Sequence, residues 1–114
     1  MVEKEPLYEY ISSLVDKKIN VPRPFFNVIN GGDHAGNKLA FQEFMISPRL
    51  NDFDNNYRAG AEIYHILKKD IENKYGKEAT LLGDEGGFAP NINNIEEVLD
   101  LMSNAVKKSG YEGD

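Results

Sequence analysis

Residues 27–48 read NVINGGDHAGNKLAFQEFMISP, and residues 83–90 read GDEGGFAP. The first stretch predicts two strands, at residues 25–29 and 39–46, joined by a glycine-rich loop. The first strand has little polar alternation, which is typical of burial on both faces. The loop opens with Asn-Gly-Gly-Asp, a strong turn signal, and its length suits antiparallel pairing of the strands. Side chains alternate along the second strand, so one face carries Ala40, Gln42, Phe44 and Ile46. The other face carries Leu39, Phe41, Glu43 and Met45.

Helical periodicity predicts a short helix and a long one on either side of these strands. Residues 6–18 carry apolar residues at helical spacing, and two prolines within residues 20–24 then force an extended connector. Residues 52–75 predict the longest helix, with Asp52 as its N-cap and Gly76 as its stop. The expected apolar stripes are Leu7, Ile11, Leu14 and Val15 in the first helix, and Phe53, Tyr57, Ala61, Tyr64, Leu67, Ile71 and Tyr75 in the second.

The last third of the chain predicts one more strand and one more helix. Residues 79–82 form a short apolar run that leads into GDEGG. Asn93, with Glu96 three residues later, resembles a capping box, and Gly110 ends the helix. The expected stripe is Ile95, Val98, Leu99, Met102, Ala105 and Val106. The predicted fold class is therefore α/β, with three strands, which are too few to close a barrel.

Composition excludes several functional classes. The 114 residues carry a net charge of −6, which argues against nucleic-acid binding and against anionic membrane surfaces. The chain has no cysteine, so disulfide and thiolate chemistry are excluded. The opening MVEKEPLYEY lacks the apolar core of a secretory signal, and no apolar run reaches the roughly 18 residues that span a bilayer. These features predict a cytoplasmic protein.

Two carboxylates are candidates for acid–base chemistry. Glu43 lies within an apolar strand, where a carboxylate is costly to bury unless it is paired or protonated. Glu85 follows a predicted strand, where α/β proteins place reactive groups, and its flanking glycines allow close approach of a ligand. If the two approached each other, one would be held protonated and could act as a general acid. The alternatives are a solvated Glu43 on a half-exposed strand and an acidic surface turn at Glu85.

His34 is the candidate residue of the glycine-rich loop. A histidine on such a loop could move onto a substrate and donate a hydrogen bond or a proton. The alternative is a solvated loop histidine. His34 and His65 are too far apart in the sequence to form a zinc motif with each other, and GGDHAG lacks the Lys-Ser/Thr ending of a phosphate-binding loop.

NVINGGDHAGNKLAFQEFMISP and GDEGGFAPNI resemble two signature stretches of the enolase family, the phosphopyruvate hydratases of glycolysis and gluconeogenesis. The segment between them and PLYEYISSL resemble helices of the same family, so the resemblance covers roughly residues 5–113. It implies the start of an enolase-type TIM barrel of order ββαα(βα)₆, incomplete, whose second strand is antiparallel. Residues 1–20 then correspond to the helix and connector that end the capping region, and residues 21–114 to the first part of the barrel domain.

The resemblance also implies a reaction and residue roles. Enolases are lyases that reversibly dehydrate 2-phosphoglycerate to phosphoenolpyruvate, with a Lys as base and Mg²⁺ stabilising the enediolate, the pattern generally given for this superfamily. By motif position, Glu85 is similar to the general acid, and Glu43 to the Glu that pairs with it. Gln42 resembles a residue of the active-site wall, and His34 the histidine of the closing loop. Asp33 departs from the family pattern, and its charge should weaken binding of an anionic substrate.

Other parts of the family's machinery have no counterpart in this sequence. The Mg²⁺ carboxylates, the Lys base and the phosphate-binding Arg-Ser pair belong to later parts of the family's barrel, so no metal ligand is expected within these 114 residues. A complete barrel needs roughly 250 residues. We therefore expect an internal piece of an enolase, inactive alone, whose full-length protein forms a homo-oligomer. The alternative is a truncated, enolase-like interaction protein without catalysis.

Overall fold

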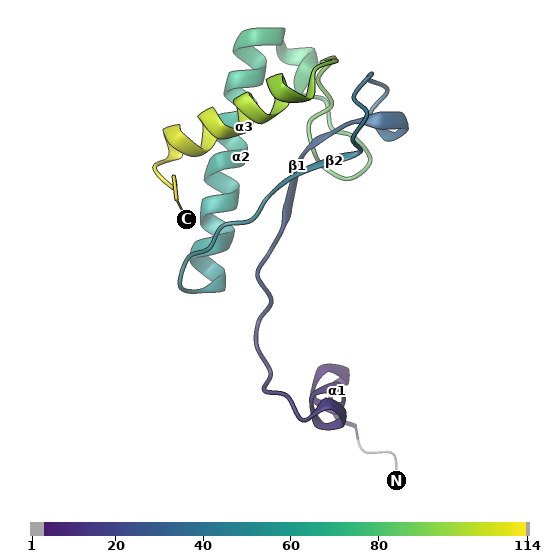
Figure 1. The fold of residues 1–114 in the computed structure, drawn as a ribbon, viewed down its shortest axis with the longest axis vertical. Helices are drawn as coiled ribbons and strands as arrows, with labels where there is room; N and C mark the ends of the chain where they lie inside the picture. Colours follow the sequence, from purple (N-terminus) through teal and green to yellow (C-terminus); the bar gives the residue numbers. More distant parts are fainter. Residues whose placement is uncertain (1–3, 114) are drawn as a thin grey trace.

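A computed structural model describes residues 4–113, and the side chain of His34 lies outside that description. Two strands, β1 (Phe26–Asn30) and β2 (Glu43–Ile46), pair antiparallel, the arrangement that the length of the loop between them suits. The long helix α2 (Phe53–Tyr75) and the helix α3 (Ile95–Ser109) pack together beside the strands, and α3 lies across α2 (Figure 1). Short 3₁₀ turns, η1 (Gly32–His34) and η2 (Lys77–Thr80), follow β1 and α2.

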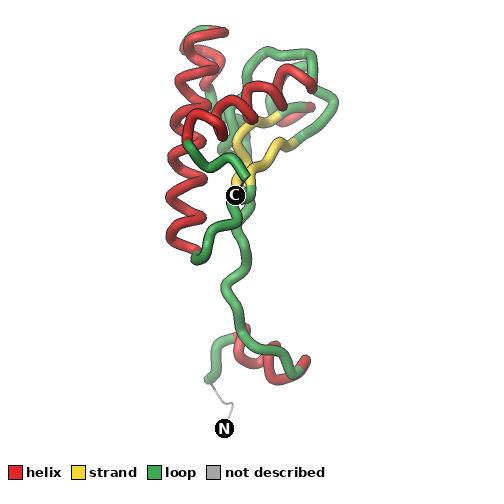
Figure 2. The backbone as a smooth tube through the Cα atoms, turned by 60° about the vertical axis from the view of Figure 1, so that its left-hand side comes forward, coloured by secondary structure: helices red, strands yellow, loops and turns green. Residues whose placement is uncertain are grey.

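The helix α1 (Leu7–Val15) confirms the predicted short helix, but it has no packing partner within the described residues. It lies at the far end of the extended connector, away from the other elements (Figures 1 and 2). None of its residues is buried, and its whole predicted stripe is exposed to solvent: Leu7, Ile11, Leu14 and Val15. Periodicity correctly located this helix because spacing alone sets the stripe, whatever the stripe then faces.

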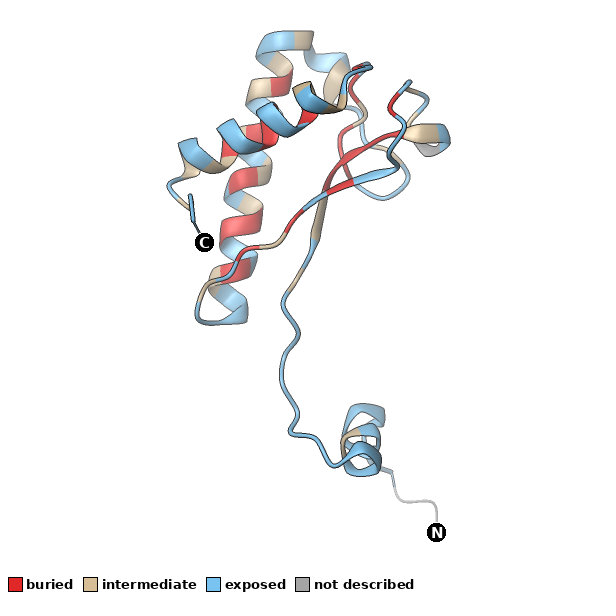
Figure 3. Cartoon of the chain, viewed as in Figure 1, coloured by how far each residue is buried: buried red, intermediate tan, exposed pale blue. Residues whose placement is uncertain are grey.

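The core lies between the strand pair and the two long helices, where the buried residues gather (Figure 3). The cap predictions for α2 hold: the Asp52 side chain accepts a hydrogen bond from the Asn55 N–H, and Gly76 ends the helix. The cap of α3 is Asn94, one residue later than expected, because its side chain accepts from the Glu96 N–H. The core side chains are Val28, Ile29, Leu39, Phe44, Ile46, Ile63, Leu67, Ile71, Phe88, Ile92, Val98, Leu101, Met102 and Ala105.

Parts of both predicted helical stripes are wrong. Phe53 and Tyr57 are exposed, and the first half of α2 instead buries Asn56, Ala59 and Gly60. The reason is steric: a Cβ on Gly60 would lie 2.6 Å from the Phe26 ring, so only a small residue lets the helix approach β1 here. In α3, Leu99 was expected in the buried stripe but faces solvent, and Leu101, which was not expected there, is buried.

The strand predictions need two corrections. Residues 79–82 do not form a strand: a 3₁₀ turn covers residues 77–80, and Leu81 and Leu82 are 68% and 60% exposed. The backbone of Leu81 and Leu82 instead forms isolated bonds with residues 88 and 89, so this apolar run is one side of the GDEGG turn and not a strand. The second strand is also shorter than residues 39–46, because the chain enters it only at Glu43. Two paired strands do not make a barrel, and none is seen in residues 4–113. In the same residues, no helix is long and apolar enough to cross a membrane.

A polar contact joins α2 to α3 and should make the free energy of unfolding depend on pH in the acid range. Lys74 Nζ lies 2.5 Å from Glu97 Oε1, and the Tyr75 hydroxyl donates to the same carboxylate. The Lys74 ammonium, and next the Tyr75 hydroxyl, hold the pKa of Glu97 below its ordinary value of 4.5. A lowered folded-state pKa gives stability that is full above pH 4.5 and lost as the pH falls through the lowered value.

We expect the urea midpoint of the wild-type chain to fall more steeply below pH 4.5 than that of Glu97→Gln. Because the contact is solvent-exposed, salt should reduce the difference between the two. Glu78→Gln, an exposed substitution of the same kind, is the control and should follow the wild-type curve. Equal acid slopes for the wild type and Glu97→Gln would contradict this assignment.

Candidate active site

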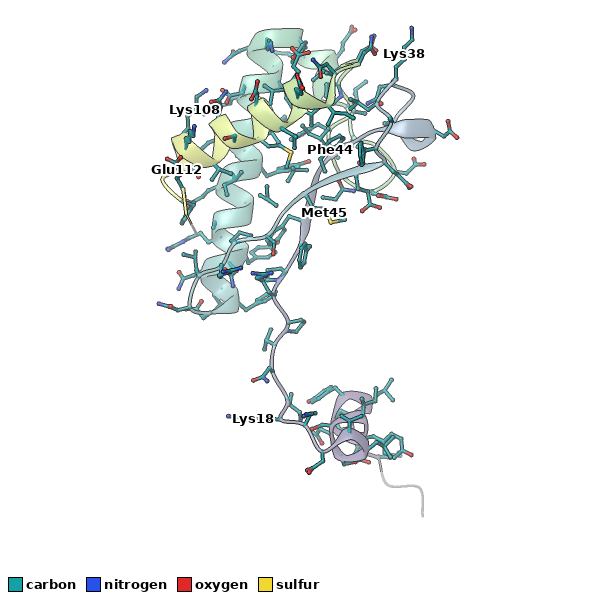
Figure 4. The ribbon with its side chains drawn as sticks, in the orientation of Figure 1. Lys18, Lys38, Phe44, Met45, Lys108 and Glu112 are labelled. Carbon is teal, nitrogen blue, oxygen red and sulfur yellow. The ribbon has the colours of Figure 1, made fainter. Side chains whose placement is uncertain are left out.

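A β-bulge at Val28 decides which side chains of β1 face the site. The register pairs Asn27 with Met45 and Asn30 with Glu43, with a shift between Asn27 and Ile29. Residues three apart in a regular strand point to opposite faces, but one extra residue brings them to the same face. Asn27 and Asn30 therefore lie on one face with their cross-strand partners Met45 and Glu43, and three of these four side chains are polar. Figure 4 shows Phe44 and Met45 of β2 on opposite sides of the strand, Phe44 toward the core.

The segment after GDEGG adds a third extended piece beside β1. The Phe88 N–H donates to the Val28 carbonyl, and the Asn30 N–H donates to the Phe88 carbonyl, each at 2.9 Å. These bonds form a parallel bridge between Ile29 and Phe88. The Phe88 ring is 1% exposed and stacks on Tyr64 of α2, with ring centroids 4.3 Å apart. The backbone and ring of Phe88 thus fix the loop that carries Glu85 against both β1 and α2.

The side chain of Asn30 packs against the loop that carries Glu85. Its side chain is fully buried, and its Oδ1 accepts a 2.9 Å hydrogen bond from the Gly87 N–H. A Cβ on Gly87 would lie 2.7 Å from that oxygen, and one on Gly83 would lie 2.8 Å from it. Both positions therefore need glycine for close approach of the loop to Asn30, whereas the sequence analysis predicted that the glycines near Glu85 allow close approach of a ligand. From α2, the Tyr64 hydroxyl donates to the Gly86 carbonyl of the same loop at 2.9 Å, and burial raises the pKa of that hydroxyl.

Glu85 receives one hydrogen bond on each carboxylate oxygen. Asn27 Nδ2 donates to Oε2 at 3.0 Å, and Gln42 Nε2 donates to Oε1 at 3.2 Å. Asn27 comes from β1 and Gln42 from the residue before β2, so the strand pair and the GDEGG loop meet at this carboxylate. Glu85 itself is exposed, so its carboxylate remains accessible to a ligand. Such a group can give or take a proton at an oxygen whose direction is set by its neighbours.

The structure brings some of the predicted residues together. Gln42 and Glu85 are in direct contact, and Glu43 lies on the exposed, polar face of β2, opposite Asn30. The proposed pairing of Glu43 with Glu85 stays a prediction. His34 belongs to η1, in the loop beside these residues, and the predicted role of its side chain lies outside what the structure describes.

Sequence reasoning missed three asparagines that build the site. Asn27 and Asn30 were interpreted only as strand and turn residues, and their spacing in the sequence does not indicate a shared face, because the bulge between them appears only in the pairing with β2. Asn37 ties the glycine-rich loop down: its Nδ2 donates to the carbonyls of Asn30 and Pro90, at 3.0 and 3.1 Å. That single amide holds together the end of β1 and the segment after GDEGG.

The described residues do not fit a metal site of their own. In the part of the chain that the structure describes, no three or more histidine and acidic side chains come together as metal ligands. Glu85 accepts one amide hydrogen bond on each oxygen and, among the described residues, is not joined by further acidic or histidine side chains in such a group.

Comparison with known families gives a match over most of the chain. Residues 18–114 match the family model described as enolase, C-terminal TIM barrel domain. The matched range contains both motif stretches, the bulged strand and the contact between Gln42 and Glu85.

Proposed function

Because the chain belongs to the enolase family through its C-terminal barrel domain, we propose that it supplies one wall of an enolase active site. The proposed reaction is the reversible dehydration of 2-phosphoglycerate to phosphoenolpyruvate. The observation that supports it is the hydrogen bond from Gln42, in the first motif, to the exposed carboxylate of Glu85, in the second motif. The Lys base and the Mg²⁺ ligands are proposed to lie outside this chain, within the same oligomeric protein in the cytoplasm.

Glu85 is proposed as the general acid. In dehydration, the base takes the proton from C2, and the electron pair left behind forms the C2–C3 double bond. The C3–O bond breaks, the Glu85 O–H gives its proton to the departing oxygen, and water leaves. In the reverse direction, the Glu85 carboxylate accepts a proton from water as the new C3–O bond forms.

The other candidates have roles around the substrate. Gln42 would line the wall and orient Glu85, and Glu43 would contact the leaving hydroxyl from the same polar face. His34 would close over the substrate from the glycine-rich loop. Residues 1–20 would form the helix and connector that precede the barrel domain, and residues 21–114 its first part.

A chimera tests this function. Residues 18–114 replace the matching stretch of an enolase of known activity, and phosphoenolpyruvate formation is followed by its ultraviolet absorbance with Mg²⁺ present. We expect activity within about tenfold of the parent, because the wall brings its own acid and orienting groups. The isolated chain, assayed in parallel, should form no phosphoenolpyruvate. A folded but inactive chimera would contradict the proposal and favour the non-catalytic interaction protein.

A further inference from the structure

We propose that Asn27 is a positioning residue that fixes the orientation of the Glu85 carboxylate. The inference rests on the proposed role of Glu85 as general acid. It assigns to β1 a function that neither motif pattern indicated, namely to determine where the proton on Glu85 points. Gln42 provides the second donor, and the pair together set the plane of the carboxylate.

The two hydrogen bonds are well placed for this purpose. Each carboxylate oxygen takes one donor, at 3.0 Å from Asn27 and at 3.2 Å from Gln42. Glu85 sits on an exposed, glycine-flanked loop, where a free carboxylate would rotate among its rotamers. Donors at two separate oxygens leave one plane and one direction for the group. A misplacement of about 1 Å in a reacting group can cost on the order of 100-fold in rate, so orientation matters here.

Asn27 is the more rigid of the two donors. Its backbone is paired with Met45 within the sheet, whereas Gln42 precedes the strand and its carbonyl accepts one backbone bond, from the Gly31 N–H at 2.8 Å. Its amide is packed under the loop, because its Oδ1 is buried and would lie 2.8 Å from a Cβ on Gly87. Gln42 is exposed and has a longer side chain, whose ordering costs more conformational entropy. The bulge at Val28 places Asn27 on the same face as Asn30, and this placement brings its amide within reach of Glu85.

Nuclear magnetic resonance of the full 114-residue chain tests the proposal without any assay of activity. In the wild type, the three-bond couplings of the Glu85 side chain should show a single rotamer. In Asn27→Leu, which keeps the size and removes the donor, they should average over several rotamers. The Gln42→Leu variant should show a smaller loss of order. Asn20→Leu, in the extended connector, is the matched control and should leave the Glu85 couplings unchanged.

The outcomes separate cleanly. A wild-type Glu85 that already averages, or an Asn27→Leu variant that keeps one rotamer, overturns the proposal. If Asn27→Leu does not fold, as judged by its amide spectrum, Asn27→Ala, which also removes the donor, serves as the second variant, and the wild-type measurement still decides.

Kinetics in the chimera then test the link to catalysis. Asn27→Leu should lower kcat by about 10- to 100-fold with KM within about twofold, and should add little when Glu85 is already Gln. Full additivity of the two changes would overturn positioning through Glu85. An unchanged rate in Glu85→Gln would instead contradict the proposed function, while the resonance result would still stand for Asn27.

Discussion

In the chimeric enzyme, Glu85→Gln is expected to lower kcat by about 10²- to 10⁴-fold, the usual contribution of a general acid. Glutamine has nearly the shape of glutamate and keeps one oxygen as an acceptor for Asn27 or Gln42, so the wall should remain in place. What it lacks is a proton to give to the departing hydroxyl. Steady-state kinetics of phosphoenolpyruvate formation measure the effect, and KM should change by no more than a few-fold.

Hydrogen exchange at C2 distinguishes loss of the acid from a general collapse of the site. Removal of the C2 proton would depend on the base, which we propose lies outside this wall, so exchange of that proton with deuterated solvent should continue in Glu85→Gln. Glu78→Gln, an exposed substitution outside the site, is the matched control and should keep parental kinetics. Parallel loss of exchange and turnover would show that Glu85 supports the site as a whole rather than donating the proton.

Phe88→Ala should cost the isolated chain about 3–5 kcal/mol of unfolding free energy, the range for truncating a buried aromatic side chain. The Phe88 ring is 1% exposed and stacks on Tyr64, so its removal leaves a cavity between the GDEGG segment and α2. A domain of ordinary stability has about 5–15 kcal/mol in total, so the loss would be a large share of it. Urea unfolding followed by circular dichroism measures the change.

Phe25→Ala provides the comparison for this effect. Phe25 is exposed, and its ring lies under the Arg23 guanidinium at 5.6 Å, so its truncation should cost about 1 kcal/mol or less. A similar loss in the two variants would show that Phe88 does not anchor the loop. The Phe88 variant should also loosen the Glu85 side chain, because the Phe88 ring packs the segment after Glu85 against Tyr64 of α2.

The helices could be predicted from the sequence because local signals define them. Asp52 marks the start of α2 through its side chain, and Gly76 and Gly110 mark the ends of α2 and α3 through their positive φ angles. The packing of α2 could not be predicted in the same way. Gly60 is buried because the Phe26 ring, which is distant in sequence, lies against it. Periodicity does not contain that information.

The site was predictable in part for a related reason. The two motifs drew attention to Gln42 and Glu85, and the structure places them in contact. Asn27 escaped notice because regular alternation puts it and Asn30 on opposite faces of the strand. The shift in register that unites them arises from pairing with β2, and a single strand read alone does not show it.

The extra residue at Val28 also affects how β1 should be compared with other sequences. In this strand the number of residues carries as much information as their identity. A relative that lacks one residue between its two asparagines would present them to opposite sides, even though the same letters are present. Matching asparagines alone is therefore not enough to transfer the contact with Glu85 to another protein. An alignment supports that transfer only where it keeps the spacing of Asn27 and Asn30 without a gap.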